Sequence, residues 1–225
     1  MSSATRTDRA DAHTPPLGHR ALTPLYDLAI AAMTREKTWR AALVKAMAPS
    51  PGDRILDIGS GTGSLSVALS TACPRIRYVG VDPDAGAVRR ARQKIVGLES
   101  NIRFHEGYFS AAEEYFSEPP NKVVSSLVLH QVPLKEKQRI IAEARKAIAT
   151  DGFLFIADYG LQRGGQRFLY RSTVQTLDGV EDTQPNADGI IPKLVEDAGF
   201  LSVEEIERFA TTTGTISIYF VCPRP

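Results

Sequence analysis

Residues 54–66 read RILDIGSGTGSLS, a short apolar run that carries one acid and leads into three glycines spaced two apart. The run at 55–58 predicts a buried strand, and residues 63–73 predict a helix directly after the glycines. Glycines at such a junction let the backbone turn tightly and approach a ligand closely, and they expose N–H groups at the start of the helix. The stretch therefore predicts a strand, loop and helix built to hold a ligand against the backbone.

On both sides of this stretch, strand signals alternate with helix signals. We expect further strands at 77–81, 102–105, 123–129 and 152–158, and helices at 83–96, 110–116, 135–148 and 187–198. Such alternation requires right-handed crossovers, which build a parallel sheet with helices on both faces. The sequence predicts an α/β, doubly wound, Rossmann-like fold.

The end of the chain departs from this alternation. Two β-rich runs at 203–209 and 215–221 are joined by ATTTG, a link too short for a crossover, so we expect them to pair antiparallel as a hairpin. Before them, residues 159–186 interrupt the pattern with glycines, arginines and scattered apolar side chains. We interpret 159–186 as an insertion that forms a lid over the ends of the strands.

Length and composition limit the class of protein. A chain of 225 residues with 43% hydrophobic and 24% charged residues fits one globular domain, which we place at 22–225. The formal net charge of +1 gives no field that would gather nucleic acid, and no apolar run is long enough to span a membrane. We expect a disordered tail at 1–21, a helical cap at 22–48, and a cytoplasmic monomer or homodimer.

The glycine spacing distinguishes between nucleoside ligands. Dinucleotide-binding enzymes use GxGxxG, whereas Gly59, Gly61 and Gly63 give GxGxG, with Ser64 where the third dinucleotide glycine would fall. The next predicted strand ends in VGVDPD, and a carboxylate at Asp82 can accept hydrogen bonds from both hydroxyls of a ribose. Asp82 before Pro83 is also typical of a helix cap, which is the alternative reading.

With these motifs together, the sequence resembles the class I S-adenosylmethionine-dependent methyltransferases, and within them the ubiquinone and menaquinone biosynthesis group. The resemblance is carried by ILDIGSGTG, the acid of VGVDPD, and SSLVLHQVP after the fourth predicted strand, and it runs from about Leu22 to the C-terminus. It implies S-adenosylmethionine as the cofactor and a seven-stranded sheet whose last strand is antiparallel.

The resemblance also implies the residues that hold the cofactor. The amino-acid end would lie at Asp57 and the loop, the ribose at Asp82 and Pro83, the adenine after the third strand, and the methionine part after the fourth. Tyr26, in the N-terminal helical region, would cover the cofactor. The remaining positions are Gly59, Ser60, Gly61, Thr62 and Gly63 in the loop, Gly107, Tyr108 and Phe109 beside the adenine, and Ser126 and Leu127 near the methionine. Tyr108 and Phe109 depart from the family, which often has Asp or Asn there.

Two missing motifs narrow the chemistry. Nucleic-acid and protein N-methyltransferases commonly have an Asn/Asp-Pro-Pro-aromatic turn after the fourth strand, where this chain has Leu-His-Gln-Val-Pro. Metal-dependent catechol methyltransferases place Asp-Asn after the fifth strand, where this chain has Asp158-Tyr159, so we predict no metal. His130 is the candidate base, since an imidazole accepts a proton near neutral pH, and Asp158 and Tyr159 are candidates for orienting the substrate.

The sequence thus predicts an S-adenosylmethionine-dependent methyltransferase that acts on a small organic molecule. Three alternatives stay open: a protein that binds the cofactor without transferring a methyl group, a nicotinamide oxidoreductase, and an RNA methyltransferase. Ser64 argues against the oxidoreductase, and the near-zero net charge argues against the RNA enzyme.

Overall fold

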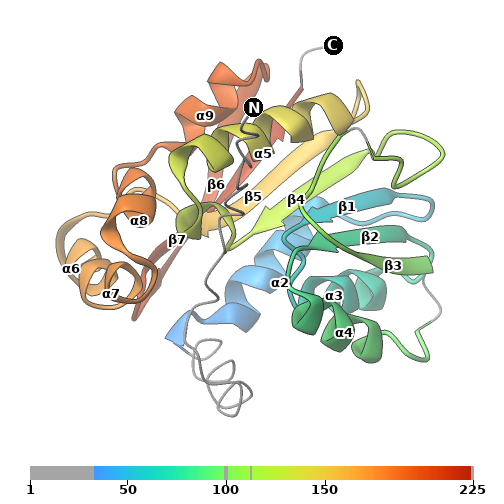
Figure 1. Ribbon diagram of the computed structural model, residues 1–225, viewed down its shortest axis with the longest axis horizontal. Coiled ribbons are helices and arrows are strands. Elements are labelled where there is room, and N and C mark those ends of the chain that lie inside the picture. Colours follow the sequence, from blue (N-terminus) through green and yellow to red (C-terminus); the bar gives the residue numbers. More distant parts are fainter. Residues whose placement is uncertain (1–32, 99–100, 112, 224–225) are drawn as a thin grey trace, which may run out of the picture.

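The computed structural model describes residues 33–98, 101–111 and 113–223, and its centre is one seven-stranded sheet (Figure 1). The predicted tail at 1–21 and Tyr26 lie outside the described residues. The strands are β1 (Arg54–Ile58), β2 (Arg77–Asp82), β3 (Asn101–Glu106), β4 (Lys122–Ser126), β5 (Phe153–Tyr159), β6 (Ser202–Thr211) and β7 (Gly214–Cys222).

The sheet has the strand order β3-β2-β1-β4-β5-β7-β6. The strands β1 to β5 pair parallel, β7 pairs antiparallel with β5, and β6 pairs antiparallel with β7. This confirms the predicted fold class and the C-terminal hairpin. The chain reverses its direction of travel across the sheet between β1 and β4, which is the place where open α/β sheets bind ligands at the carboxyl ends of their strands.

Helices cover both faces of the sheet (Figure 1). They are α2 (Glu36–Met47), α3 (Ser64–Ala72), α4 (Ala85–Lys94), α5 (Leu134–Ala147), α6 (Gly164–Ser172), α7 (Val174–Asp178), α8 (Val180–Ala187) and α9 (Ile191–Asp197), with a 3₁₀ turn η1 (Leu129–Gln131). Figure 1 shows α2, α3 and α4 on one face and α5 and α9 on the other. The helices α6 to α8 gather at one end, beyond β5 and β7.

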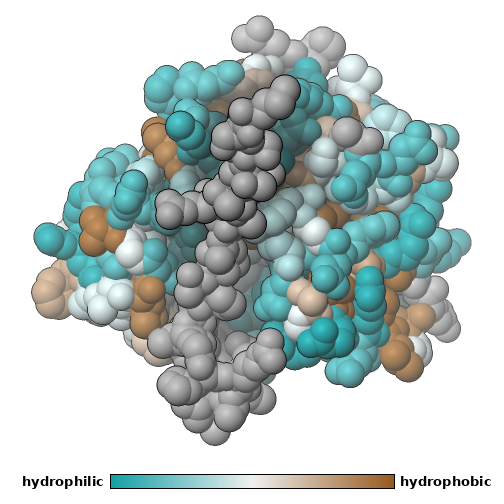
Figure 2. All heavy atoms as spheres, in the orientation of Figure 1, coloured by the Kyte–Doolittle hydropathy of each residue, from teal (hydrophilic) through white to brown (hydrophobic). Residues whose placement is uncertain are grey.

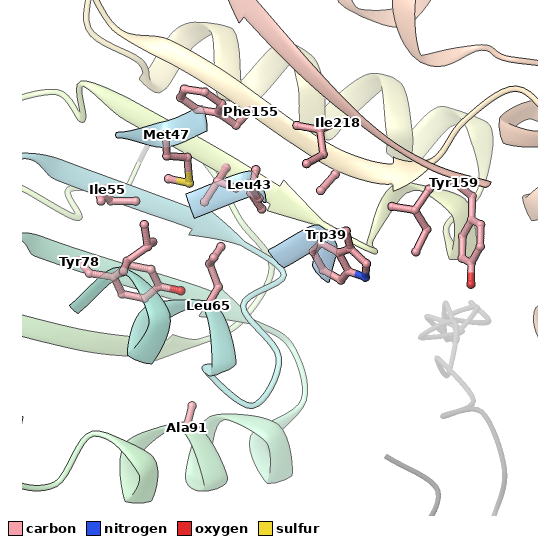
Figure 3. Close-up of a cluster of buried hydrophobic side chains, with 14 of the residues drawn as sticks. Trp39, Leu43, Met47, Ile55, Leu65, Tyr78, Ala91, Phe155, Tyr159 and Ile218 are labelled. Carbon is pink, nitrogen blue, oxygen red and sulfur yellow. The ribbon is translucent and has the colours of Figure 1, made fainter. Parts of the chain in front are cut away.

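Each face has its own apolar cluster, because alternate side chains of a strand point to opposite faces. In β1, Ile55 packs with the α2 side, and Leu56 packs with the α5 side. Figure 3 shows Trp39 and Leu43 of α2 along the first of these faces, with Tyr159 beyond them at the end of β5. Both α2 side chains are fully buried, so α2 is part of the core.

Two sequence predictions of helices were wrong. No helix forms in the described part of 110–116, because that loop folds around the ring of Tyr115, which stacks on Phe109 at 5.9 Å and accepts the Ser110 N–H through its hydroxyl. The helix expected at 187–198 begins only at Ile191. Gly189, with a φ of +82°, ends the preceding helix α8 and separates the two.

The amino ends of β1 and β4 are tied together by polar side chains, at the opposite edge from the glycine loop. Lys122 Nζ donates to the Asp53 carboxylate and, at 3.0 Å, to the carbonyl of Ala48 after α2. Asn121 Nδ2 donates to Asp53 Oδ1 at 2.8 Å. Burial raises the pKa of Asp53, but the hydrogen bonds from Lys122 and Asn121 outweigh it and hold that pKa below its usual value. This network fixes the sheet end that carries no candidate site.

Candidate functional site

The predicted loop joins β1 to α3 as a tight backbone turn. Gly59, Gly61 and Gly63 all have positive φ, and the Gly59 and Ser60 N–H groups both donate to the Val81 carbonyl of β2. A Cβ on Gly59 would lie 2.2 Å from a methyl of Val128, and one on Gly63 would lie 2.9 Å from the Phe104 ring. These two glycines are required by packing.

Gly61 differs from its two neighbours. A Cβ built on Gly61 meets no atom within 4 Å, so this residue borders open space. Thr62 next to it is half-buried, and its hydroxyl accepts a hydrogen bond at 2.7 Å from Lys94 Nζ, at the end of α4. Gly61 and Thr62 thus form the part of the loop that a ligand can approach.

Asp82 stands at the end of β2, next to the loop. Its Oδ2 accepts the Gly61 N–H at 2.8 Å, and its Oδ1 accepts the Asp84 N–H at 2.9 Å. Burial raises the pKa of Asp82, and these two backbone donors oppose that shift. The cap of α4 is Asp84, which accepts from Gly86 and Ala87, so the helix-cap reading of Asp82 was wrong. Pro83 between the two acids is exposed.

Asp57 is buried inside β1 instead of at its rim. Its Oδ2 accepts the hydroxyl of Tyr78, whereas its Oδ1 has no hydrogen-bond partner among the described residues. Burial raises the pKa of Asp57 to about 7, opposed by the Tyr78 hydrogen bond and by the charge of Arg40. The hydroxyl of Ser60 in the loop is likewise buried without a partner. Unpaired buried oxygens of this kind are costly, and they suit a polar ligand that supplies donors.

After β3, the two aromatic residues have different environments. The Gly107 N–H donates to the Asp82 carbonyl at 3.0 Å, which keeps this turn beside β2. Tyr108 is 61% exposed at the turn, whereas Phe109 is buried in the core. Only the Tyr108 ring is therefore free to cover a ligand here; the Phe109 ring is committed to packing.

The end of β4 carries backbone strain. Leu127 has a φ of +55°, a left-handed conformation that is rare for a residue with a branched side chain, and its N–H donates to the Ala157 carbonyl of β5 at 2.9 Å. Such outliers concentrate at binding and catalytic positions. Ser126, the last residue of β4, is half-buried beside it. The turn leads directly into η1, which contains His130.

His130 and Asp158 form a buried dyad. The Nδ1 atom of His130 lies 2.8 Å from Oδ1 of Asp158, and the same carboxylate accepts the Leu129 and Tyr159 N–H groups at 2.7 Å each. The Tyr159 ring meets the imidazole edge-on at a centroid distance of 4.9 Å. Because Asp158 is fully buried and its carboxylate accepts these hydrogen bonds, it orients His130 and the end of β5.

The sequence interpretation missed two residues around this dyad. Lys137 of α5 is completely buried and donates to the Leu129 carbonyl; burial lowers its pKa to about 8, opposed by Asp158 and Asp182. Asp178, at the end of α7, lies 3.7 Å from His130 Nε2. The spacing of Lys137 with Ile140, Ile141 and Ala144 places it on the buried face of α5 and was the available signal. No sequence pattern marks Asp178.

The predicted lid at 159–186 begins with a strand residue and continues as helices. Tyr159 belongs to β5, and its hydroxyl pairs with Thr213 Oγ1 at 2.7 Å. Residues 164–187 form α6 to α8, and Asn186 Nδ2 returns to the Tyr159 carbonyl at 2.9 Å. Figure 2 shows brown, hydrophobic spheres among teal ones over this region, where the exposed apolar side chains are Phe168, Leu177 and Val180.

Parallel strands bring these residues to one edge of the sheet. In the pairing register, Ile58 lies beside Val81 and Ser125, and Ser126 lies beside Ala157. The glycine loop, Asp82, Leu127 and the dyad therefore all stand at the carboxyl ends of neighbouring strands. Within the described part of the chain, no group of His, Cys, Asp and Glu side chains has an arrangement that could hold a metal ion. The helices described there also lack the length and apolar character to cross a membrane.

Part of the chain is similar to a known protein family. Residues 55–152 match a family described as "Methyltransferase domain". The chain is 35% identical over 91 residues to the ubiquinone/menaquinone biosynthesis C-methyltransferase UbiE of Syntrophotalea carbinolica, a match that covers 40% of this chain and 38% of that protein. The similarity thus spans less than half the length of this curated relative.

Solved structures extend the likeness to nearly the whole chain. The S-adenosylmethionine-dependent methyltransferase SibL in its apo form superposes with a TM-score of 0.68 at 18% identity, covering 92% of this chain and 60% of SibL. The magnesium protoporphyrin IX methyltransferase ChlM from Synechocystis PCC 6803, solved with bound SAH, gives a TM-score of 0.64 at 22% identity, covering 91% and 89%. The match over residues 55–152 supports the predicted relationship to the methyltransferases, and the likeness to SibL and ChlM over most of the chain shows that the fold is shared.

Proposed function

We propose, for a chain related to the class I S-adenosylmethionine-dependent methyltransferases, that its function is to transfer the methyl group of S-adenosylmethionine to a small organic molecule. The observation that carries this proposal is the placement of two different half-sites on one sheet edge. One half combines the glycine loop with Asp82, and the other combines His130 with Asp158. A nucleoside-binding half next to a proton-accepting half suits transfer between two bound molecules.

The residues of the first half fit this cofactor. Gly61 borders open space, Asp82 stands beside it with lone pairs remaining on its carboxylate, and the unpaired Oδ1 of Asp57 and Oγ of Ser60 are buried nearby in β1 and the loop. In this proposal Asp82 and Pro83 hold the ribose, and Asp57 and the loop from Gly59 to Gly63 receive the polar amino-acid end. Tyr108 covers the adenine, and Ser126 and Leu127 line the methionine part.

When bound, S-adenosylmethionine supplies an electrophilic methyl group whose transfer is a single in-line displacement. This chain's own residues then position the acceptor and remove its proton. Asp158 holds His130 through Nδ1, which leaves Nε2 as the atom that accepts the proton. Tyr159 keeps the imidazole edge in place, and burial of the dyad excludes water. No covalent bond between enzyme and substrate is needed.

A small acceptor is favoured by the lid and by a missing motif. The helices α6 to α8 stand beside His130 and carry apolar side chains, which suits a partly apolar molecule of modest size. The Asn/Asp-Pro-Pro-aromatic turn is absent: the segment between β4 and α5 reads LVLHQVP, and Pro119-Pro120 precedes β4. The region preceding α2, including Tyr26, is proposed to complete the cover. A cytoplasmic monomer or homodimer stays a prediction.

Calorimetric titration tests this function. Purified protein is titrated separately with S-adenosylmethionine, S-adenosylhomocysteine and NADH. Micromolar binding of the two sulfur nucleosides without binding of NADH supports the proposal, and methyl transfer is then sought over a panel of small acceptors. Absence of binding of either sulfur nucleoside would refute the cofactor assignment. Binding without transfer to any acceptor would favour the alternative of a cofactor-binding regulatory protein.

A further inference from the structure

The two ring nitrogens of His130 face carboxylates from different elements. Nδ1 lies 2.8 Å from Oδ1 of Asp158 in β5, and Nε2 lies 3.7 Å from Oδ2 of Asp178 in α7. Asp178 is largely buried, with 20% of its side chain exposed. The imidazole therefore lies between a rigid strand and a short helix of the lid region.

The second contact requires a proton. If Nδ1 donates its hydrogen to Asp158, the Nε2 of a neutral ring is an acceptor, and it faces another acceptor at Asp178. The pair is favourable only when either the ring or Asp178 holds a proton. Burial raises the pKa of Asp178, while the neighbouring His130 lowers it. The distance of 3.7 Å exceeds a direct hydrogen bond, so Asp178 acts on the ring through its charge when the ring is protonated.

Resting on the proposed function, we propose that Asp178 is a positioning residue that stabilises the His130 imidazolium formed during transfer, and that the acceptor is a molecule bearing an ionisable O–H or N–H. Asp158 fixes one side of the ring and Asp178 the other, so the charged ring has a carboxylate on both nitrogens. The O–H or N–H of the acceptor donates its hydrogen to Nε2 on the side of the ring that Asp178 borders.

The step balances within these groups. The proton of the acceptor O–H or N–H moves to the lone pair of Nε2, and the electron pair of the broken bond stays on the acceptor. That electron density forms the new bond to the methyl carbon. The bond between the methyl carbon and the donor sulfur breaks with its electron pair remaining on sulfur, which becomes a neutral thioether. No oxidant, reductant or metal is required.

Other charged and titratable groups also surround His130, and any pH effect must include them. Lys137 of α5 donates a hydrogen bond to the carbonyl of Leu129, the residue before His130, and it interacts electrostatically with Asp158 and Asp182. The groups that contact the ring are Asp158 and Tyr159 from β5 and Asp178 from α7; farther out lie Lys137 from α5, Asp182 from α8, which interacts with Lys137, and Tyr170 from α6, which packs on Tyr159.

The role of Asp178 is testable without knowing the acceptor. Long-range ¹H–¹⁵N spectra of the imidazoles are recorded against pH for the full chain, for Asp178→Asn and for Glu181→Gln, with the His130 signal assigned from His130→Gln. Glu181 is an exposed acid in the first turn of α8 and serves as the matched control. We expect Asp178→Asn to lower the midpoint of the His130 titration by about 1 pH unit, because an opposite charge is lost. Glu181→Gln should leave it unchanged.

An unchanged midpoint in Asp178→Asn, with the melting temperature also unchanged, would overturn the role of Asp178. If Asp178→Asn shifts the melting temperature, Asp178→Glu provides the second test. A restored carboxylate should return the midpoint toward that of the natural chain, and failure to do so while the fold is intact would also contradict the proposal.

The acceptor class is tested with radiolabelled S-adenosylmethionine and matched probes. Phenols and aromatic amines are each paired with the same molecule in which the O–H or N–H hydrogen is replaced by methyl. Labelling of the protic partner alone supports the inference, and equal labelling of the capped partner would overturn it. Labelling of neither, with cofactor binding intact, counts against the proposed methyl transfer, while the imidazole titration still decides the role of Asp178.

Discussion

The Nδ1 atom of His130, in the turn after β4, lies 2.8 Å from Oδ1 of Asp158, at the end of β5. The two residues are far apart in the chain, and the parallel pairing of β4 with β5 brings their segments together. Because Asp158 also accepts the Leu129 and Tyr159 N–H groups, its carboxylate fixes both the imidazole and the backbone on either side of it.

Replacing Asp158 with Asn should therefore misorient His130. The Asn side chain has a single oxygen acceptor and an NH₂ donor in place of the second oxygen, so at least one of the three groups that donate to Asp158 loses its partner. We expect methyl transfer to fall about 100-fold or more, since the base would lose its orientation and its counter-charge. Rates are measured with the acceptors found by the panel, and cofactor affinity is measured by calorimetry.

The same variant should keep its affinity for S-adenosylmethionine within about twofold, because Asp158 does not belong to the nucleoside half of the site. A large loss of affinity together with an unchanged rate would contradict the division of the site into two halves.

Replacing Asp82 with Ala should weaken cofactor binding. We expect a loss of roughly 1–3 kcal/mol in binding free energy, the cost of removing hydrogen bonds to a charged acceptor. Calorimetric titration of S-adenosylhomocysteine measures it. The matched control is Asp84→Ala, which removes the α4 cap that accepts from Gly86 and Ala87. That control should lower stability by about 0.5–2 kcal/mol and leave affinity unchanged. Equal affinities in both variants would exclude the ribose role of Asp82.

Alanine at Gly61 should separate ligand approach from folding. A Cβ there meets no protein atom within 4 Å, so the variant should fold, with about 1–2 kcal/mol of strain from its φ of +52°. Cofactor affinity should fall at least tenfold, because the new methyl group occupies the space beside the loop. Gly97, with a φ of +85° and equally open surroundings, is the control for strain alone.

Gly97→Ala should leave binding unchanged at a similar cost in stability. Gly59→Ala should instead disturb the fold itself, because its Cβ would lie 2.2 Å from a Val128 methyl. If Gly61→Ala binds S-adenosylhomocysteine as tightly as the natural chain, the loop does not contact the ligand.

The raised pKa of Asp57 predicts a dependence of stability on pH. Burial raises this pKa to about 7 from its ordinary value of 3.8, so the folded state binds the proton more tightly than the unfolded state. The resulting stabilisation is complete below about pH 4 and is lost as the pH rises through 7. Asp57→Asn carries no ionisable group at this position. Its free energy of unfolding, relative to that of the natural chain, should therefore rise by roughly 2–4 kcal/mol from pH 5 to pH 8.5.

Urea unfolding of Asp57→Asn and of the natural chain at pH 5 and at pH 8.5, without ligand, measures this difference in the free energy of unfolding. The curves of the two proteins should converge at low pH apart from a constant offset. A difference between them that does not change from pH 5 to 8.5 would show that Asp57 titrates as an ordinary carboxyl.

The sequence by itself determined the parts that depend on local pattern. Strand and helix periods predicted the parallel sheet, the short ATTTG link predicted the hairpin, and the glycine spacing distinguished the loop from a dinucleotide site. These features follow from periodicity and turn chemistry, which act over a few residues. The position of His130 after a strand was also readable, because parallel strands end at a common edge.

Only the tertiary structure decided which side chains meet. Periodicity does not reveal that Asp158 accepts hydrogen bonds from His130 and two N–H groups, or that the buried Lys137 donates to η1. It also does not reveal that Asp178 of α7 lies beside His130. Those contacts join β4, β5, α5 and α7, which are distant in sequence. Their geometry is set by how whole elements pack, and burial then sets the charges that the site carries.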